Sequence, residues 1–493
     1  MKKSLRFLVL ALVVLMILPL VVACKGNGDD PKKTTDPNKV VSDPSTDSLL
    51  PAKDWDGDEF LILGRSSSYA SISNFEIARD NMPGDVVGDA VWTRNQNLKD
   101  KYNFVIAQEL VTDTAQQAQT LYDAQDDVYD LVIYIARKVF THASSGYLLD
   151  LNDVDYINYD HNAWNKDINA SLTIGGRLYA ATSKFLLQDK ARTYTLFYNR
   201  DLARQYEMGQ LESLVDANQW TLEKYETLAR ELMFDIDGGG MGGEKDSFGI
   251  AAGSRGEDFV ALLYGAGFTL GTNDGETIKL TGPTLAMSNI ITEAGKIWFD
   301  KNLRATPQDF AAAAGTAVNY DSAAAVFCDQ RALFFSGMPS DYDSSLNKGA
   351  NFEIGVLPFP KLDAAQERYY NFANVTNTTL FTIPYTVSDS AQIGFYLQAV
   401  SEESCTTTYP AYIDTKCKVQ DAYDELTAKY LDMSFQNVTY DVVTCLDPGG
   451  IYTIIRDSIT QYNRNAFISL YNAKGDLPQI TLQEYIDAFE ANG

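Results

Sequence analysis

The sequence predicts an α/β fold with mostly parallel sheet, because short apolar runs alternate with segments of helical periodicity. Hydrophobic residues make up 45% of the 493 residues, which supplies a large core and excludes global disorder. Residues 130–135 form an apolar run bounded by polar residues, which is typical of a strand buried on both faces. The length indicates two or three such domains.

The individual elements follow from the same patterns. The predicted strands are short, mostly apolar runs at residues 60–63, 104–107, 130–135, 195–198 and 352–357. A helix is predicted over residues 89–102. A second helix is predicted over 221–234, because Leu222, Tyr225 and Leu228 share one face and Thr221 can cap its start.

The N-terminus carries an uncharged run over residues 7–24 that follows three basic residues and ends in Val21-Val22-Ala23-Cys24. This pattern is typical of a secretion signal, and a small residue before a lone cysteine resembles the bacterial lipoprotein lipobox. It implies that residues 1–23 are a signal peptide and that Cys24 is lipidated after cleavage. An ordinary membrane anchor is the alternative, since the run is near the spanning threshold.

Residues 24–52 are polar and rich in Asp, Lys, Pro, Ser and Thr, so we expect a flexible tether behind the lipidated cysteine. The chain has 40 Lys and Arg against 66 Asp and Glu, for a net charge of −26. That charge opposes nucleic acid as a partner. No second apolar stretch approaches membrane length, so the body is expected on the extracellular face of the membrane.

Histidine and cysteine usage argues against most hydrolytic and metal chemistry. Only two histidines are present, which excludes a zinc site built from several histidines and leaves few candidates for a Ser-His-Asp triad. The cysteines other than Cys24 lack CxxC spacing. A disulfide between Cys405 and Cys417 and a set of buried free thiols both stay open.

Six short motifs then follow one another along the body of the chain, at residues 129–134, 146–151, 176–180, 197–202, 220–224 and 355–361. In this order and spacing they resemble extracellular solute-binding proteins of ABC importers, in the group that includes the maltose-binding protein. Phe197-Tyr198-Asn199-Arg200-Asp201-Leu202, which is similar to that family's Y-N-K-D-L, is the most specific. The likeness is greatest to surface lipoproteins of Gram-positive bacteria.

This resemblance implies a two-lobe, periplasmic-binding-protein-like α/β fold (type II) in which crossing strands join the lobes and the ligand lies between them. Lobe 1 would comprise residues 55–181 plus 374–408, and lobe 2 residues 182–373 plus 409–493. The implied function is capture of a carbohydrate, a mono- or oligosaccharide that can be acidic, by a monomeric lipoprotein that delivers it to an ABC permease. The chain would not be an enzyme and would have no catalytic residues.

Two alternatives stay open. The same scaffold can bind a peptide or another organic solute, because fold alone does not fix the ligand. A surface glycosidase would need a pair of carboxylates, and 66 acidic residues always provide two. The coherent order of the importer motifs and the lack of an acid-pair motif argue against the glycosidase.

A sugar site needs aromatic rings for apolar faces and charged or amide groups for hydroxyls. The resemblance places Tyr134, Arg137 and Lys138 where the maltose-binding protein has a sugar-contacting aromatic, an acid and a cation. It places Arg192 at an acidic ligand position. These two changes from acid to arginine indicate a ligand with a carboxylate or a different hydroxyl pattern. The further ligand candidates are Tyr69, Trp92, Trp164, Asp341, Tyr342 and Tyr452.

Residues 235–246 resemble a degenerate EF-hand-type calcium loop. Asp235, Asp237 and Asp246 would supply carboxylates and Met241 its carbonyl. Glycines replace the oxygen-bearing side chains at positions five and nine of the motif, which weakens calcium binding. We therefore favour a glycine-rich loop without a metal, and no cofactor is expected.

Overall fold

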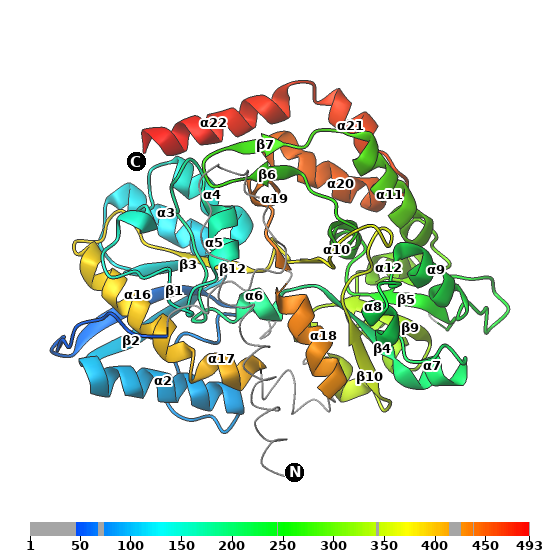
Figure 1. The fold of residues 1–493 in the computed structure, drawn as a ribbon, viewed down its shortest axis with the longest axis horizontal. Helices are drawn as coiled ribbons and strands as arrows, with labels where there is room; N and C mark the ends of the chain where they lie inside the picture. Colours follow the sequence, from blue (N-terminus) through cyan, green and yellow to red (C-terminus); the bar gives the residue numbers. More distant parts are fainter. Residues whose placement is uncertain are drawn as a thin grey trace, which may run out of the picture. The chain divides into compact units, whose positions relative to one another are not determined.

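The computed structural model describes residues 46–67, 73–243, 245–341, 345–413, 425–436 and 438–492 (Figure 1). Residue contacts divide the chain into Met1–Pro44 and Ser45–Gly493, and everything described below lies in the second unit. The predicted signal peptide, Cys24, most of the tether, Tyr69, Tyr342 and Cys417 lie outside the described residues. Within them, no helix has both the length and the apolar character needed to cross a membrane.

The first sheet has the strand order β12-β3-β1-β2. Its strands are β1 (Asp58–Arg65), β2 (Phe104–Val111), β3 (Leu131–Ile135) and β12 (Thr379–Thr382). Strand β1 is parallel to β2 and β3, whereas β12 is antiparallel to β3. The carboxyl ends of β1 and β3 therefore lie at the same edge of the sheet.

The second sheet has the order β10-β4-β9-β5-β8. Its strands are β4 (Thr195–Asn199), β5 (Phe248–Ala252), β8 (Arg304–Ala305), β9 (Ala332–Gly337) and β10 (Ile354–Leu357). Strand β5 is parallel to β8 and β9, while β4 is antiparallel to β9 and β10. Two α/β layers confirm the predicted fold class, although the second sheet has as many antiparallel as parallel strand pairs.

The helices that accompany the first sheet are α2 (Val86–Tyr102), α3 (Thr114–Ala124), α4 (Ala136–Ser144), α5 (Lys166–Leu172), α16 (Ser390–Ser404) and α17 (Thr408–Pro410), with the 3-10 turn η3 (Leu151–Asp153). The elements between the sheets and within the second layer are α6 (Gln188–Ala191), α7 (Arg200–Gln205), α8 (Glu212–Asp216), α9 (Leu222–Arg230), α10 (Glu257–Gly265), β6 (Gly271–Asn273), β7 (Ile278–Leu280), α11 (Leu285–Trp298), α12 (Pro307–Ala314), α13 (Ser322–Cys328), α14 (Pro339–Asp341) and α15 (Asn347–Gly349). The C-terminal part contains β11 (Asn371–Phe372), α18 (Glu425–Gln436), β13 (Val438–Thr439), α19 (Val442–Leu446), η6 (Pro448–Gly450), α20 (Ile451–Thr460), α21 (Phe467–Ala473) and α22 (Leu477–Ala491).

Crossing segments connect the two sheets. Thr193, just before β4, forms a bridge with Ala373, and the Tyr194 N–H donates to the Phe372 carbonyl at 2.9 Å. Strand β11 pairs in parallel with β13. Three parts of the chain that are distant in sequence therefore lie side by side between the sheets.

The C-terminal helix α22 also reaches the first layer. The Tyr179 hydroxyl donates to the Phe489 carbonyl at 3.1 Å, and the Asn492 amide donates to the Ser144 carbonyl at 2.9 Å. The last residues of the chain thus contact elements that the sequence assigns to lobe 1. The predicted lobe boundaries themselves stay a prediction.

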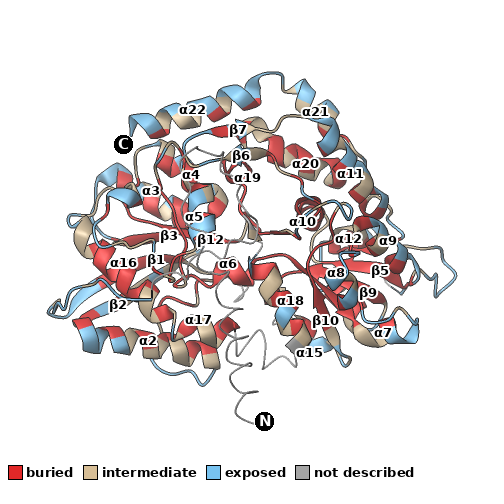
Figure 2. Cartoon of the chain, viewed as in Figure 1, coloured by how far each residue is buried: buried red, intermediate tan, exposed pale blue. Residues whose placement is uncertain are grey.

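The central strands lie in the hydrophobic core, which explains why their sequences are largely apolar. Every residue of β4, β5 and β9 is buried, and Figure 2 shows the central strands of both sheets as buried. A strand covered by helices on both faces must be apolar throughout, rather than alternating. The buried apolar residues of both layers form one continuous cluster.

The predicted elements differ from the structure mainly at their ends. Helix α2 starts three residues earlier than predicted, because the Asp85 carboxylate accepts from the Gly88 N–H and caps it. Thr221 caps α9 as predicted, but this helix ends at Arg230 instead of residue 234. Cys328, Cys405 and Cys445 are free thiols.

Candidate functional site

Charged side chains gather where the carboxyl edges of the two sheets come together. Strand β1 ends in Arg65, and β3 leads directly to Arg137 on α4. In the second sheet, β5 leads to Glu257 and Asp258 on α10, and β9 leads to Asp341 on α14. Such edges are where open α/β sheets bind ligands. We call the following set the interlobe cluster: Arg65, Arg137, Arg192, Glu257, Asp258, Asp341, Asp447, Tyr452 and Arg456.

Arg65 reaches this edge because glycine precedes it. A Cβ atom on Gly64 would lie 2.5 Å from the Ile77 side chain and 2.8 Å from that of Leu110. Only glycine lets β1 pass this close to its neighbours. The Asn74 side chain then holds the backbone, since its oxygen accepts from the Arg65 N–H at 2.8 Å.

Arg137 connects the first layer to the C-terminal part of the chain. Its guanidinium donates to the Asp447 carboxylate at 3.0 Å and lies over the Tyr452 ring, 5.2 Å from the ring centroid. The Asp447 carboxylate also accepts from the Tyr452 N–H at 2.8 Å and from the Thr453 hydroxyl at 2.7 Å. One carboxylate thus fixes both Arg137 and the first turn of α20.

Helix α20 in turn contacts the second layer. The Tyr452 hydroxyl donates to the Glu257 carboxylate, and the Arg456 guanidinium donates to the same carboxylate at 3.0 Å. Burial raises the pKa of Tyr452 well above its ordinary value, and the Glu257 charge adds to that rise. A continuous polar chain therefore runs from α4 through α20 to α10.

Arg192 occupies the first crossing segment and is buried. Its guanidinium donates to the Ser340 hydroxyl at 2.9 Å, and its Nε lies 3.5 Å from the Gln188 side-chain oxygen. Gln188 in turn donates to the Ser73 carbonyl, which follows β1, at 2.8 Å. Burial lowers the pKa of Arg192, Asp341 opposes this, and the charge of Arg65 adds to the lowering.

Two carboxyl groups in the cluster are strongly perturbed. Burial raises the pKa of Asp258 well above its ordinary value, and the charges of Asp341 and Glu257 add to the rise. Burial also raises the pKa of Asp341, against the attraction of Arg192. One oxygen of Asp258 accepts from the Ser254 N–H at 2.8 Å, while its buried Oδ1 has no hydrogen-bond partner among the described residues.

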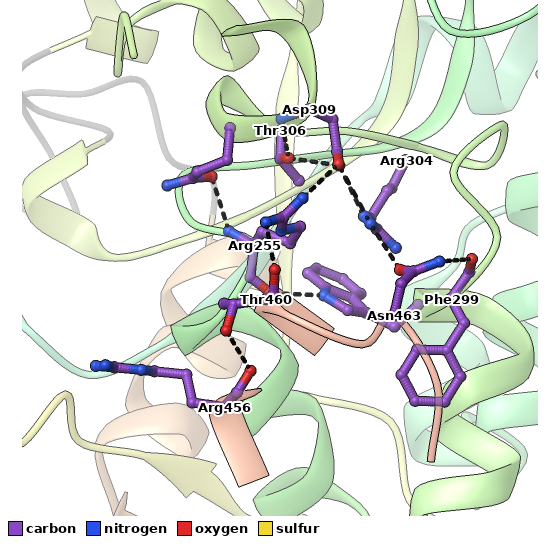
Figure 3. A network of polar contacts seen from close by, with 10 residues as sticks. Arg255, Phe299, Arg304, Thr306, Asp309, Arg456, Thr460 and Asn463 are labelled. Atoms are coloured by element: carbon purple, nitrogen blue, oxygen red, sulfur yellow. Dashed lines mark hydrogen bonds and ion pairs between the residues drawn. The ribbon is translucent and has the colours of Figure 1, made fainter. Parts of the chain in front are cut away.

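A polar network behind the cluster holds α10 and α20 together (Figure 3). Arg255 and Arg304 both donate to the Asp309 carboxylate at 3.0 Å. Arg255 also donates to the Thr460 carbonyl at 2.9 Å, and Arg304 to the Asn463 side chain at 3.2 Å. The network thereby fixes the loop before Glu257 against the end of α20. We call Arg255, Arg304 and Asp309 the Asp309 network.

The structure brings four predicted ligand residues into the cluster: Arg137, Arg192, Asp341 and Tyr452. Lys138 is exposed on the same helix as Arg137. Trp92 lies on α2, which packs against α16 and α17. Tyr69 and Tyr342 lie outside the described residues.

Two other predicted ligand residues lie in the core of the first layer. Tyr134 is fully buried, and its hydroxyl lies 2.8 Å from that of Tyr122 and 3.0 Å from Nδ1 of His142. Trp164 is 5% exposed and donates to the Gln398 side chain at 2.9 Å. Both rings pack against other aromatic residues, so their environment in this conformation is structural.

Sequence reasoning missed Arg65, Glu257, Asp258, Asp447 and Arg456. A local signal existed for the acidic pair, because Glu257 and Asp258 follow five apolar or small residues at 248–252 and a Gly-Ser-Arg-Gly turn. Asp447 precedes a Pro-Gly-Gly turn, where helix starts are common. For Arg65, the sequence offers no indication of a role in the site beyond its position at the end of a strand.

The glycine-rich loop places three carboxylates together. Ligand atoms of Asp235, Asp237 and Asp246 all lie within 4.8 Å of one another, and Met241 lies in the same loop. However, the Asp235 carboxylate accepts from the N–H groups of Gly238 and Gly240, and that of Asp246 accepts from Gly242 and Gly243. The carboxylates thus fold the loop themselves, and the glycine positions add no side-chain oxygen for calcium.

A cavity of about 350 Å³ lies apart from the cluster residues. It is lined by α5, by the end of α10 and by the crossing segments, including Ile168, Phe268, Arg368, Tyr370 and Tyr440. None of its lining residues belongs to the interlobe cluster. A small molecule could lie in this cavity.

A scan against protein-family models and a search of curated protein sequences each find no match. Solved structures do match. A cyclo/maltodextrin-binding protein complexed with maltotetraose has 13% identity and a TM-score of 0.53, covering 88% of this chain and 97% of that one. An ABC substrate-binding protein from Listeria monocytogenes in complex with cycloalternan has 14% identity and a TM-score of 0.52, covering 88% and 99%.

UgpB from Mycobacterium tuberculosis, in complex with glycerophosphocholine, has 17% identity and a TM-score of 0.52, covering 87% of this chain and 99% of that one. In all three comparisons, nearly the whole of the solved chain is matched. The similarity therefore covers both layers and the segments that cross between them. The chain has the two-lobe α/β fold of the solute-binding proteins of ABC transporters.

Proposed function

We propose that the protein is the solute-binding component of an ABC importer and that it captures a carbohydrate, a mono- or oligosaccharide, at the interlobe cluster. The observation that carries this proposal is the meeting of charged and aromatic groups from the carboxyl edges of both sheets, next to the crossing segments. A solute bound there contacts both layers at once. Its binding energy can therefore favour one relative arrangement of the layers, which is the signal that a permease can read.

The side chains suit a polyhydroxylated solute. Carboxylates of Glu257 and Asp447 and guanidiniums of Arg137 and Arg456 can exchange their mutual contacts for hydroxyl groups. Tyr452, whose buried ring lies beneath Arg137, is the aromatic group of the cluster, and aromatic rings suit the apolar face of a sugar. Two of the similar structures hold oligosaccharides, maltotetraose and cycloalternan.

We further propose that the protein performs no chemistry on its solute and acts as a monomer on the extracellular face of the cell membrane, anchored through lipidated Cys24. A second candidate is an organic solute other than a sugar. UgpB, with the same fold, is in complex with glycerophosphocholine. A surface glycosidase is the weakest alternative, because the strongest carboxylate contacts in the cluster are to arginine and tyrosine within the protein.

A thermal-shift panel of monosaccharides, oligosaccharides, uronic acids and short peptides tests the proposal. Saturable stabilisation by saccharides, with the saccharide recovered intact, is expected. Arg192→Ala should weaken that stabilisation, whereas Tyr134→Ala reports mainly on packing because this ring is buried. Stabilisation by peptides alone, or turnover of a bound saccharide, would contradict the proposal.

A further inference from the structure

Arg65 is the one cluster cation without a protein partner among the described residues. Its side chain is half-buried, and its Nε and Nη1 atoms are buried without a hydrogen-bond acceptor. The described residues also form no ion pair with it. Buried donors on a charged group are costly when they stay unpaired, so such a group needs an explanation.

Other buried arginines in this chain show what a structural role looks like. Arg94 donates to the carbonyls of Glu76 and Ile77 at 2.7 and 2.6 Å. Arg304 and Arg255 share the Asp309 carboxylate, although each keeps one nitrogen unpaired. Each of these guanidiniums has an acceptor within the protein, whereas Arg65 has none among the described residues.

The acidic group that acts electrostatically on Arg65 forms no ion pair with it among the described residues. Asp113 attracts Arg65 electrostatically, but its carboxylate caps α3 by accepting from the Gln116 N–H at 3.2 Å. Arg65 also lies close enough to a second cation for its charge to lower the pKa of Arg192. Two guanidiniums therefore act at this ligand-binding edge, although Asp341 attracts Arg192 more strongly than Arg65 repels it.

Burial lowers the pKa of both guanidiniums, and the repulsion between them lowers that of Arg192 further. An anion between them would relieve this repulsion and supply the missing acceptors. A charged hydrogen bond of this kind is stronger than one between neutral groups. The pair lies on two sides of the site: Arg65 belongs to β1, and Arg192 contacts Ser340 beside β9.

We propose that Arg65 and Arg192 bind an oxyanion group of the captured solute, so that this protein selects an acidic carbohydrate over its neutral counterpart. This inference rests on the proposed function. The oxyanion is either the carboxylate of a sugar acid or a phosphate ester, and both are recognised by the same guanidinium chemistry.

The test titrates the full-length protein with matched pairs of solutes by calorimetry. Each pair is an acidic sugar and its neutral parent: glucuronate with glucose, galacturonate with galactose, their oligomers with the neutral oligomers, and glucose 6-phosphate with glucose. Inorganic phosphate alone serves as a probe of the anion subsite. The variants are Arg65→Gln, Arg65→Lys and, as a matched control, Arg230→Gln, which removes an arginine on the outer helix α9.

The proposal expects tighter binding of at least one acidic member than of its neutral parent. Arg65→Gln should weaken binding of that acidic solute by about 10- to 100-fold, and by clearly more than it weakens binding of the neutral parent, as loss of a charged hydrogen bond implies. Arg65→Lys should retain part of the preference, and Arg230→Gln all of it. Higher salt should weaken only the acidic member.

The contrary outcomes are distinguishable. Neutral sugars that bind as tightly as their acidic counterparts, with no differential effect of Arg65→Gln, would overturn the anion proposal and leave the carbohydrate-binding function standing. If no saccharide of either kind binds, the proposed function fails and the anion proposal fails with it. A folded Arg65→Gln protein, shown by an unchanged melting temperature, makes either result interpretable.

Discussion

Arg304 and Arg65 carry the same charge in two regions of the molecule, but of these two only Arg304 pairs with a carboxylate of the part of the chain that the structure describes. Arg304 lies in the Asp309 network, where Arg255 shares the same counter-ion and α20 closes the group. Arg65 lies at the open end of β1, beside another cation. The comparison teaches that the buried arginines of the scaffold are matched within the protein, whereas Arg65 has no partner among the described residues, which is why we propose it as a contact for the solute.

Removal of the counter-ion from the scaffold should have the largest effect. Asp309→Ala leaves Arg255 and Arg304 buried without their carboxylate, and we expect a loss of about 3–5 kcal/mol in the free energy of unfolding. Urea denaturation measures it. Lys296→Ala removes an exposed ion pair with Glu293 and should leave the unfolding curve almost unchanged. An equal loss of unfolding free energy in the two variants would show that the buried Asp309 network is worth no more than an exposed ion pair.

The Asp309 network also predicts an acid limit to stability. Burial raises the pKa of Asp309, but Arg304 and the Thr306 hydroxyl outweigh it, so its pKa lies below the ordinary value. Because its pKa is depressed, ionised Asp309 contributes stability that is fully present above the unfolded-state pKa of about 3.9. This stability is lost as pH falls through the pKa of the folded state.

For Asp258 in the cluster, we expect stability to depend on pH in the opposite direction. Its folded-state pKa is raised, so the protonated form stabilises the fold at low pH and this stability is lost as pH rises from about 3.9 toward the folded value. Asp258→Asn removes the buried charge and should stabilise the solute-free protein by about 1–2 kcal/mol at pH 8. Melting temperatures measured from pH 4 to 8 should show the gain growing with pH; a gain that shrinks with pH would be the wrong sign.

Arg65→Gln should have a small stabilising effect or none on the solute-free protein. The change removes unpaired buried donors and the repulsion with Arg192, and it breaks no ion pair that the structure describes. We expect the free energy of unfolding to rise by less than about 1 kcal/mol. A loss as large as that of Asp309→Ala would show that Arg65 is a scaffold residue, and the comparison would fail.

Chelation should have the smallest effect. The Asp235 and Asp246 carboxylates already accept backbone N–H groups of the loop, so EDTA is expected to leave the melting temperature unchanged. A clear decrease that added calcium reverses would show that Asp235, Asp237 and Asp246 hold a metal after all.

Sequence patterns predicted the fold well because periodicity and capping are local. The apolar run at residues 130–135 became β3, and Thr221 caps α9, since burial and hydrogen bonding at a helix start depend on neighbouring residues. The site was harder to predict. Tyr134 occupies a ligand position by resemblance, yet its ring packs on His142, because β3 is buried from Leu131 through Tyr134.

The unpredicted site residues come from tertiary structure. Asp447 reaches Arg137, and Arg456 reaches Glu257, across separations of about 300 and 200 residues that no local pattern encodes. Sequence cannot show that Arg65 lacks a partner among the described residues, because this depends on every residue packed around it.

The central claim is that a solute binds between the two sheets at the interlobe cluster, and hydrogen-exchange mass spectrometry with and without a stabilising saccharide tests it most directly. The account predicts that the saccharide slows exchange at both edges together, in peptides that cover residues 64–67, 136–139, 253–258 and 451–456. Protection confined to one sheet, or protection of α5 and residues 436–440 around the separate cavity, would contradict it.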